Sequence, residues 1–227
     1  MFWVNKMKKI GEFFKKVFST ENLKKFIRTY IWLIVLLFVV DIVTKWVVLN
    51  HFGIDAMEAG RRSDSGAIPV INGFCYIGGS LNVGAAFSML YGKRVLLLII
   101  SLVMTGVFVG YYVSQYKKLD GLYKIGLALM IAGAFGNLID RAFYWESIVG
   151  FNGVIDWIIF KFGNWEFAMF NIADSCLVIG IILVLLKMVI DEIKAAKEKA
   201  KRGEYKYSPE ELEKMNKEQE NEENKGE

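Results

Sequence analysis

The sequence has few of the residues that metal sites and most hydrolytic triads require. Its 227 residues include one histidine (His51), two cysteines (Cys75 and Cys176) and two prolines. A single histidine argues against a histidine-ligated metal site and leaves a Ser-His-Asp triad without an assignable base. The cysteines are far apart and Cys176 lies in an apolar run, which argues against a disulfide framework and a cysteine zinc site. We therefore expect no metal and no cofactor.

Two common hydrolase motifs are also missing, and the net charge is modest. Neither H-E-x-x-H nor G-x-S-x-G occurs in the chain, which removes the sequence signatures of zinc peptidases and of α/β-hydrolases. The formal net charge is +4, and the basic residues are gathered in particular segments. Nucleic-acid binding is not needed to explain them, and we expect no nucleic-acid partner.

Apolar residues, by contrast, are abundant. The chain is 54% hydrophobic and 15% aromatic, which is too apolar for most soluble domains of this length. About 20 helical residues cross a hydrocarbon core of about 30 Å. Four segments are therefore predicted to span a membrane: residues 30–49, 95–113, 125–143 and 167–186. The third carries Gly126, Gly133 and Gly136, which permit close contact between helices.

Lysine and arginine are distributed unevenly between the connections, which predicts an orientation. Residues 1–28 hold eight, the connection 114–124 holds three, and the segment after Leu186 holds ten. The long connection 50–94 holds four, and 143–166 holds only Lys161. Because positively charged loops stay in the cytoplasm, we predict a multi-pass protein with both termini cytoplasmic and both long connections outside.

Three segments outside the spans carry local structural signals. Residues 1–28 are basic with apolar residues at helical spacing, which indicates a helix in the inner interface, although a solvated leader remains the alternative. The apolar segment that follows residues 1–28 contains Asp41 and has no A-x-A-like cleavage site, so we do not expect a cleavable signal peptide. In the tail, SPEELEK predicts a short helix capped by Ser208. IPVINGFCYI predicts a hairpin with a type I′ turn at Asn72-Gly73.

Ionisable residues within membrane spans are costly, and here they fall in the half of each helix that is predicted to be outer. Asp41 and Lys45 are four residues apart on one helix face, so we expect them to pair, with Lys45 reaching outward and Asp41 bracing the bundle. Asn137, Asp140 and Arg141 form a second group. Their spacing fits either a helix-end ion pair or a site where Arg141 binds a substrate carbonyl.

Two further aspartates border apolar runs. Asn171 and Asp174 are spaced to share a face of the fourth span, and Asp156 lies in GVIDWIIF, which is too short to span and indicates a strand or re-entrant segment. Alone, Asp156 would be a surface residue. Beside Asp174 it becomes half of a carboxyl pair in which one group keeps a proton, as in aspartic peptidases.

Two other functional classes fit parts of the pattern. A transporter or ion-conducting bundle would relay protons or cations through Asp41, Asp140 and Asp174, but the inner halves of the second and fourth spans hold no ionisable residue. A non-catalytic assembly protein would use Gly106-x-x-x-Gly110 for helix packing, although that motif serves equally within one chain. Neither class explains why the polar residues gather at one end of the spans.

Five short blocks carry a resemblance to a known family. They are DIVTK (Asp41 to Lys45), NVGAAFS (Asn82 to Ser88), GAFGNLIDR (Gly133 to Arg141), GVIDW (Gly153 to Trp157) and FNIADS (Phe170 to Ser175). In this order they resemble the lipoprotein signal peptidases, also called signal peptidase II. The resemblance covers the chain from about Asp41 to Leu186. Two connections depart from it, because 143–153 and the first long loop both exceed the family's usual length.

The resemblance implies a fold, an activity and a site. The fold is an all-α membrane protein with four transmembrane helices and a small extracytoplasmic β element. The activity is that of an intramembrane aspartyl endopeptidase, which removes signal peptides from diacylglyceryl-modified bacterial prolipoproteins. The implied catalytic pair is Asp156 and Asp174. The implied substrate-binding residues are Asn82, Asn137, Arg141 and Asn171, and the supporting residues are Asp41, Lys45 and Asp140.

The same resemblance places the chain in the bacterial cytoplasmic (inner) membrane with its active site near the outer leaflet. The expected partners are a diacylated prolipoprotein and membrane lipid, and we expect a monomer. We divide the chain into a basic amphipathic segment (1–28), a four-helix membrane peptidase domain (29–190) and a charged cytoplasmic tail (191–227).

Overall fold

The computed structural model describes residues 28–59, 65–84, 90, 92–144, 150–202, 211 and 213–218. The chain divides into two compact units, Met1–Val184 and Leu185–Glu227. The predicted N-terminal amphipathic helix and the Ser208 cap lie outside the described residues. Within the second unit, residues 213–218 are helical and exposed, which fits the short solvated helix expected for the tail.

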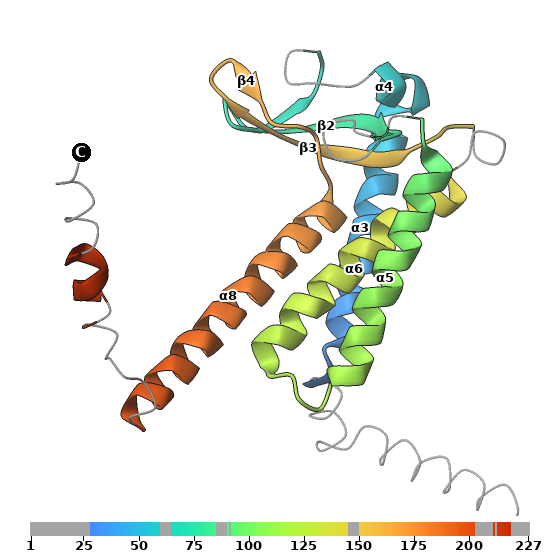
Figure 1. Ribbon diagram of the computed structural model, residues 1–227. Helices are drawn as coiled ribbons and strands as arrows, with labels where there is room; N and C mark the ends of the chain where they lie inside the picture. The colour runs from blue at the N-terminus through green and yellow to red at the C-terminus, as the bar shows by residue number, and fades with distance from the viewer. Residues whose placement is uncertain are drawn as a thin grey trace, which may run out of the picture. The chain divides into compact units, whose positions relative to one another are not determined.

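Four helices in the described part of the chain are long and apolar enough to cross a membrane. They are α3 (Ile31–Phe52), α5 (Arg94–Gln115), α6 (Gly121–Phe143) and α8 (Ile172–Lys201) (Figure 1). The four predicted spans are confirmed, with one correction. The fourth helix begins at Ile172 rather than Phe167, because Phe167 to Met169 are not helical and Phe170 bridges to the sheet at Ile158.

Small residues let α6 lie close to its neighbours, as predicted. A side chain at Gly126 would meet Gly180 of α8, and one at Gly133 would meet Ala173 and Leu177 of the same helix. The start of α6 is fixed by Asp120, whose carboxylate accepts hydrogen bonds from the backbone N–H groups of Leu122 and Tyr123. By contrast, side chains at Gly106 and Gly110 of α5 would meet nothing within 4 Å. The assembly motif therefore does not pack against described residues.

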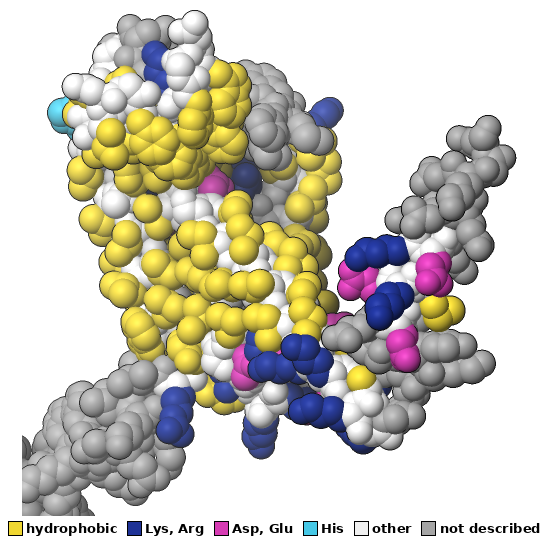
Figure 2. Space-filling model, turned by 90° about the vertical axis from the view of Figure 1, so that its left-hand side faces the viewer, with side chains coloured by type: hydrophobic (Ala, Val, Ile, Leu, Met, Phe, Trp, Pro, Cys, Tyr) yellow, Lys and Arg dark blue, Asp and Glu magenta, His cyan; other side chains and the backbone are white. Residues whose placement is uncertain are grey.

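The outward faces of the helices are apolar, as a lipid environment requires. Many large apolar side chains are exposed, among them Val35, Val43, Leu102, Val103 and Ile182. Figure 2 shows this apolar surface as a nearly continuous covering of one face, interrupted by a recess in which acidic and basic side chains are visible. Exposed apolar surface on this scale indicates contact with lipid rather than water.

A four-stranded antiparallel sheet lies at one end of the helices (Figure 1). Its order is β1 (Ile68–Ile71), β2 (Cys75–Asn82), β3 (Val154–Phe162) and β4 (Trp165–Glu166). The short helix α4 (Ile54–Ala59) packs against β2 through Met57, which is fully buried. Both long connections therefore build one sheet, since β2 comes from the first and β3 from the second.

The predicted hairpin between β1 and β2 is present, but the predicted type I′ turn is wrong. Ile71 pairs with Cys75, so the loop has three residues, and the N–H of Phe74 donates to the carbonyl of Ile71 at 3.0 Å. A type I′ turn needs positive φ at both central residues. Here Gly73 has φ +78° whereas Asn72 does not have a positive φ, which is the pattern of a type II turn.

Candidate active site

A cavity of about 800 Å³ opens between the sheet, the end of α6 and the first turns of α8. Asp156 and Asp174 both line it, together with Asn82, Asn137 and Arg141. The rest of the lining is mostly apolar and includes Phe160, Phe162, Phe167, Phe170, Leu177, Val178 and Ile179. Five polar side chains from β3, α8, α6 and the end of β2 thus meet in one mostly apolar cavity.

Strand β3 holds Asp156 at the cavity wall with only 3% of its surface exposed. Each of its oxygens accepts one amide hydrogen bond, Oδ2 from Asn82 Nδ2 at 2.9 Å and Oδ1 from Asn171 Nδ2 at 2.7 Å. Burial raises the pKa of Asp156 to about 8, and the nearby charge of Asp174 adds to the rise while the two amides oppose it. The direction of this shift favours the protonated form of Asp156 near neutral pH.

Asp174 is held by the cap of helix α8. Asn171 directly precedes the helix, and its Oδ1 accepts from the N–H of Asp174 at 2.9 Å. In return, Oδ2 of Asp174 accepts from the N–H of Asn171 at 3.1 Å, which is the reciprocal arrangement of a capping box. Asn171 and Asp174 therefore meet at the start of α8, as their spacing predicts, although Asn171 is the cap and not a residue of the helix. Oδ1 of Asp174 accepts from Asn137 Nδ2 at 2.7 Å.

Asn171 connects the two carboxyl groups directly. Its side-chain amide donates to Asp156, and its backbone N–H donates to Asp174. The same amide also donates to Asn137 Oδ1 at 3.1 Å and to the carbonyl of Ile155 at 3.3 Å. Asn171 is completely buried, so one residue fixes both carboxyl groups relative to each other.

Behind this layer lies a buried ion cluster centred on Lys45. Its Nζ lies 2.7 Å from Asp41 Oδ2 and 2.8 Å from Asp140 Oδ2, and it donates to Asn137 Oδ1 at 3.2 Å. Lys45 pairs with Asp41 as predicted, but the expectation that it reaches outward is wrong, because its side chain is 0% exposed. The two carboxylates offset the cost of removing the Lys45 ammonium group from water, so the side chain can stay buried.

The Lys45 cluster also orients Asn137. An ammonium group has only donors, so the side of Asn137 that faces Lys45 must be its oxygen. Its amide nitrogen is then directed at Asp174, where it donates. Asp41 and Asp140 extend the cluster to two backbones, since Asp41 Oδ1 accepts from the N–H of Ala173 at 2.9 Å and Asp140 Oδ2 accepts from that of Ile155 at 3.4 Å.

Arg141 is placed differently from its neighbours on α6. Asp140 pairs with Lys45, so the predicted alternative of an Asp140–Arg141 ion pair is not what forms. The Nη1 of Arg141 makes two long hydrogen bonds, to Ser101 Oγ at 3.3 Å and to the carbonyl of Asn137 at 3.4 Å. Arg141 lines the cavity with a buried Nε that has no partner among the described residues.

A family model described as Signal peptidase (SPase) II matches residues 33–190, which is more than half of the chain. The chain belongs to the signal peptidase II family. The resemblance of the five sequence blocks is thereby confirmed. The match begins near the start of α3, contains the whole sheet, and ends within α8 at residue 190.

Curated members of the signal peptidase II family resemble the chain over most of their length. A lipoprotein signal peptidase from Bacillus pumilus (strain SAFR-032) is 38% identical over 151 residues, which are 66% of this chain and 86% of that protein. A lipoprotein signal peptidase from Bacillus subtilis (strain 168) is 35% identical over 171 residues, 74% of this chain and 98% of that protein. A solved bacterial membrane enzyme has a TM-score of 0.57 and 30% identity, covering 72% of this chain and 89% of its own.

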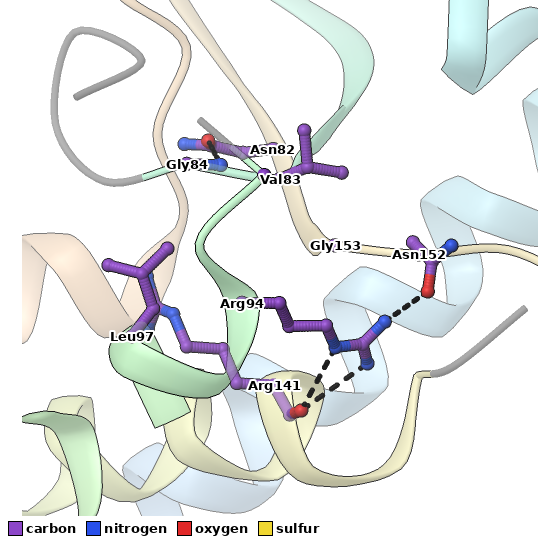
Figure 3. A pocket seen from close by; sticks show the side chains of 9 residues that line it. Asn82, Val83, Gly84, Arg94, Leu97, Arg141, Asn152 and Gly153 are labelled. Carbon is purple, nitrogen blue, oxygen red and sulfur yellow. Dashed lines mark hydrogen bonds between the residues drawn. The ribbon is translucent and has the colours of Figure 1, made fainter. Parts of the chain in front are cut away.

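The chain also has a second cavity, of about 340 Å³, which the sequence did not indicate. Asn82, Val83 and Arg141 line both cavities, so the second one adjoins the first. Figure 3 shows side chains that line the second cavity. It is also lined by Arg94, the first residue of α5, and by Asn152 and Gly153. Sequence reasoning missed Arg94 because an arginine at the end of a span has an ordinary explanation as an interface anchor.

The remaining chemical groups give no sign of a metal. Among the described residues, no three His, Cys, Asp or Glu side chains are arranged to hold an ion. Both cysteines are free, Cys75 partly exposed and Cys176 buried. The buried charged side chains of the described part are Asp41, Lys45, Asp140 and Asp156. All four belong to the site, and they do not continue as a polar file along the helices.

Proposed function

We propose that this member of the signal peptidase II family is an aspartic endopeptidase that removes the signal peptide from diacylglyceryl-modified prolipoproteins. Family membership supports the substrate class, because the curated relatives are named lipoprotein signal peptidases. The observation that carries the aspartic mechanism is the bridge through Asn171, which holds Asp156 and Asp174 on one cavity. Among the described residues, the buried charged side chains do not continue along the helices, which gives no support to a transporter.

The two carboxyl groups differ in the way that the reaction requires. Asp156 is protonated at neutral pH because burial raises its pKa, and we assign the ionised role to Asp174. Asp174 takes a proton from water as the water oxygen attacks the scissile carbonyl carbon, while Asp156 gives its proton to the carbonyl oxygen. When the intermediate collapses and the C–N bond breaks, Asp156 recovers a proton from a hydroxyl and Asp174 passes its proton to the leaving amine.

The surrounding polar groups position this pair and the peptide. Asn82, Asn137 and Asn171 direct amide hydrogens at the carboxyl oxygens. Arg141 has a buried Nε without a described partner at the cavity wall, and we assign it to a carbonyl group of the substrate backbone. Asp41, Lys45 and Asp140 have supporting roles because they hold Asn137 and the backbones of Ala173 and Ile155.

The apolar lining supports the proposal of a lipidated substrate. The cavity wall includes Leu177, Val178 and Ile179 on α8, a helix whose exposed residues face lipid. A substrate anchored by acyl chains gains binding energy from the bilayer and arrives with its scissile bond at a fixed depth. We propose that this depth is the outer leaflet of the cytoplasmic membrane, that both termini are cytoplasmic, and that the enzyme acts as a monomer.

The test is cleavage of a synthetic prolipoprotein peptide by the purified full-length chain in lipid nanodiscs. We expect Asp156→Asn and Asp174→Asn each to lower kcat at least about 1,000-fold, since each removes one proton-transfer group. The control Asp55→Asn alters an exposed aspartate of α4 and should leave cleavage unchanged. A peptide without diacylglycerol should be cleaved poorly. Substantial activity in either dyad variant would reject the dyad, and equal cleavage of both peptides would reject the lipid requirement.

A further inference from the structure

We propose that Arg94 is a positioning residue for the active site, a role that rests on the proposed peptidase activity. Arg94 holds the end of α6 that carries Arg141 against the segment that leads into the strand of Asp156. Figure 3 shows its guanidinium group between the carbonyl of Arg141 and the side chain of Asn152. Arg94 lines the second cavity but not the one that contains the two aspartates.

One side of the guanidinium group binds the C-terminal end of α6. Nε and Nη2 of Arg94 donate to the carbonyl of Arg141 at 3.4 and 3.3 Å, and Nη2 also donates to the carbonyl of Tyr144. The last carbonyls of a helix have no partner within the helix, and they lie at the negative end of its dipole. A half-buried cation at this point holds the turn from which the Arg141 side chain extends to both cavities.

The other side of the guanidinium group binds the segment before β3. Nη1 of Arg94 donates to Asn152 Oδ1. The next residue, Gly153, has φ +114°, and a side chain there would lie 2.9 Å from the carbonyl oxygen of Asn82. The chain can therefore approach β2 closely only at this glycine. Asn82 pairs with Val154 in the sheet and donates to Asp156, so the place of Asn152 determines where that donor lies.

Arginine is suited to this position because its planar fork reaches several acceptors at once. One Arg94 side chain connects three acceptors in two separate segments, which a lysine ammonium on its flexible stem does not reproduce. Without Arg94, α6 and β3 remain joined by the hydrogen bond from Ile155 N–H to Asp140. We therefore expect the fold to persist, while the end of α6 is held less firmly against the segment before β3. Misplacement of reacting groups by about 1 Å lowers rates about 100-fold.

The experiment compares Arg94→Ala with Lys93→Ala, which removes an exposed cation at the adjacent position. In nanodiscs with the lipidated peptide, we expect Arg94→Ala to lower kcat/KM at least about tenfold, with kcat reduced and KM raised. Lys93→Ala should stay within about twofold of the parent, and Arg94→Lys should recover part of the loss. Asn152→Ala should reduce kcat/KM as well, and adding it to Arg94→Ala should lower activity little further, because both changes break one connection.

A second measurement separates this role from the activity itself. In Arg94→Ala, amide hydrogen exchange should become faster between residues 141 and 156 and stay unchanged in the first turns of α8, relative to Lys93→Ala. Unchanged exchange there, unchanged kcat/KM, or a loss equal to the loss of folded protein would each overturn the proposal. A parent protein that cleaves no lipidated peptide would instead reject the proposed function, and the exchange experiment would still decide whether Arg94 holds the joint.

Discussion

Replacement of Asn82 by alanine tests whether Asp156, rather than Asp174, carries the proton of the carboxyl pair. Asn82 Nδ2 donates to Asp156 Oδ2 at 2.9 Å, and this hydrogen bond lowers the pKa of Asp156 against the larger effect of burial. Hydrogen bonds to charged groups contribute about 1.5 to 3 kcal/mol, and one pKa unit corresponds to about 1.4 kcal/mol. The substitution removes a hydrogen bond that stabilises the ionised form of Asp156 more than its protonated form. The pKa of Asp156 should therefore rise from about 8 by about one unit.

The sign of this shift is visible in the pH dependence of kcat/KM. Activity requires Asp156 to be protonated, so it should fall as pH rises through about 8 in the parent. In Asn82→Ala this decline should move to higher pH, although the maximum rate falls because the carboxyl group is less well positioned. The assay measures cleavage of the lipidated peptide from about pH 5 to about pH 10, with Asn72→Ala in the exposed β1–β2 turn as control. A decline that stays in place or moves to lower pH would refute the assignment of the proton to Asp156.

Two further predictions concern the supporting residues. Lys45→Met leaves Asp41 and Asp140 buried without their cation, so the free energy of unfolding measured in detergent should fall by about 3 to 5 kcal/mol. The control Lys194→Met alters an exposed lysine and should leave this free energy unchanged. Equal stability of the two variants would contradict the supporting role of the ion cluster. Gly136→Ala places a carbon 2.5 Å from Asp41 Oδ2 and should reduce activity, whereas Gly106→Ala meets nothing within 4 Å and should be neutral. The same peptide assay compares them, and an active Gly136→Ala enzyme would show that Asp41 can move freely.

The membrane spans and the polar residues of the site could be predicted because both stand out against their surroundings. An apolar run of about 20 residues has few alternatives, and an aspartate inside one has a large desolvation cost, which draws attention to Asp41 and Asp140. Asp174 was prominent for the same reason. Asp156 lies in a strand, where a carboxyl group is ordinary, and only its partner across the chain distinguishes it.

What could not be predicted depends on contacts between distant segments. The i, i+4 spacing of Asp41 and Lys45 indicates a pair, but the second carboxylate of Asp140 comes from a helix about 95 residues later in the chain, and it decides that Lys45 stays buried. Likewise, Asn171 caps α8 because the preceding residue, Phe170, bridges to β3 at Ile158. No local sequence pattern predicts this bridge. Arg94 meets Arg141, Tyr144 and Asn152 because the fold brings these distant residues next to it.

The pairing of β2 with β3 also limits when the enzyme can become active during its synthesis. Asn82 lies 74 residues before the aspartate to which it donates, and Asn171 emerges from the ribosome later still. A nascent chain that ends before Asn171 lacks the bridge between the two carboxyl groups and the cap that positions one of them. Proteolytic competence should therefore appear only after the chain has been made past Asp174, at the start of the last membrane helix.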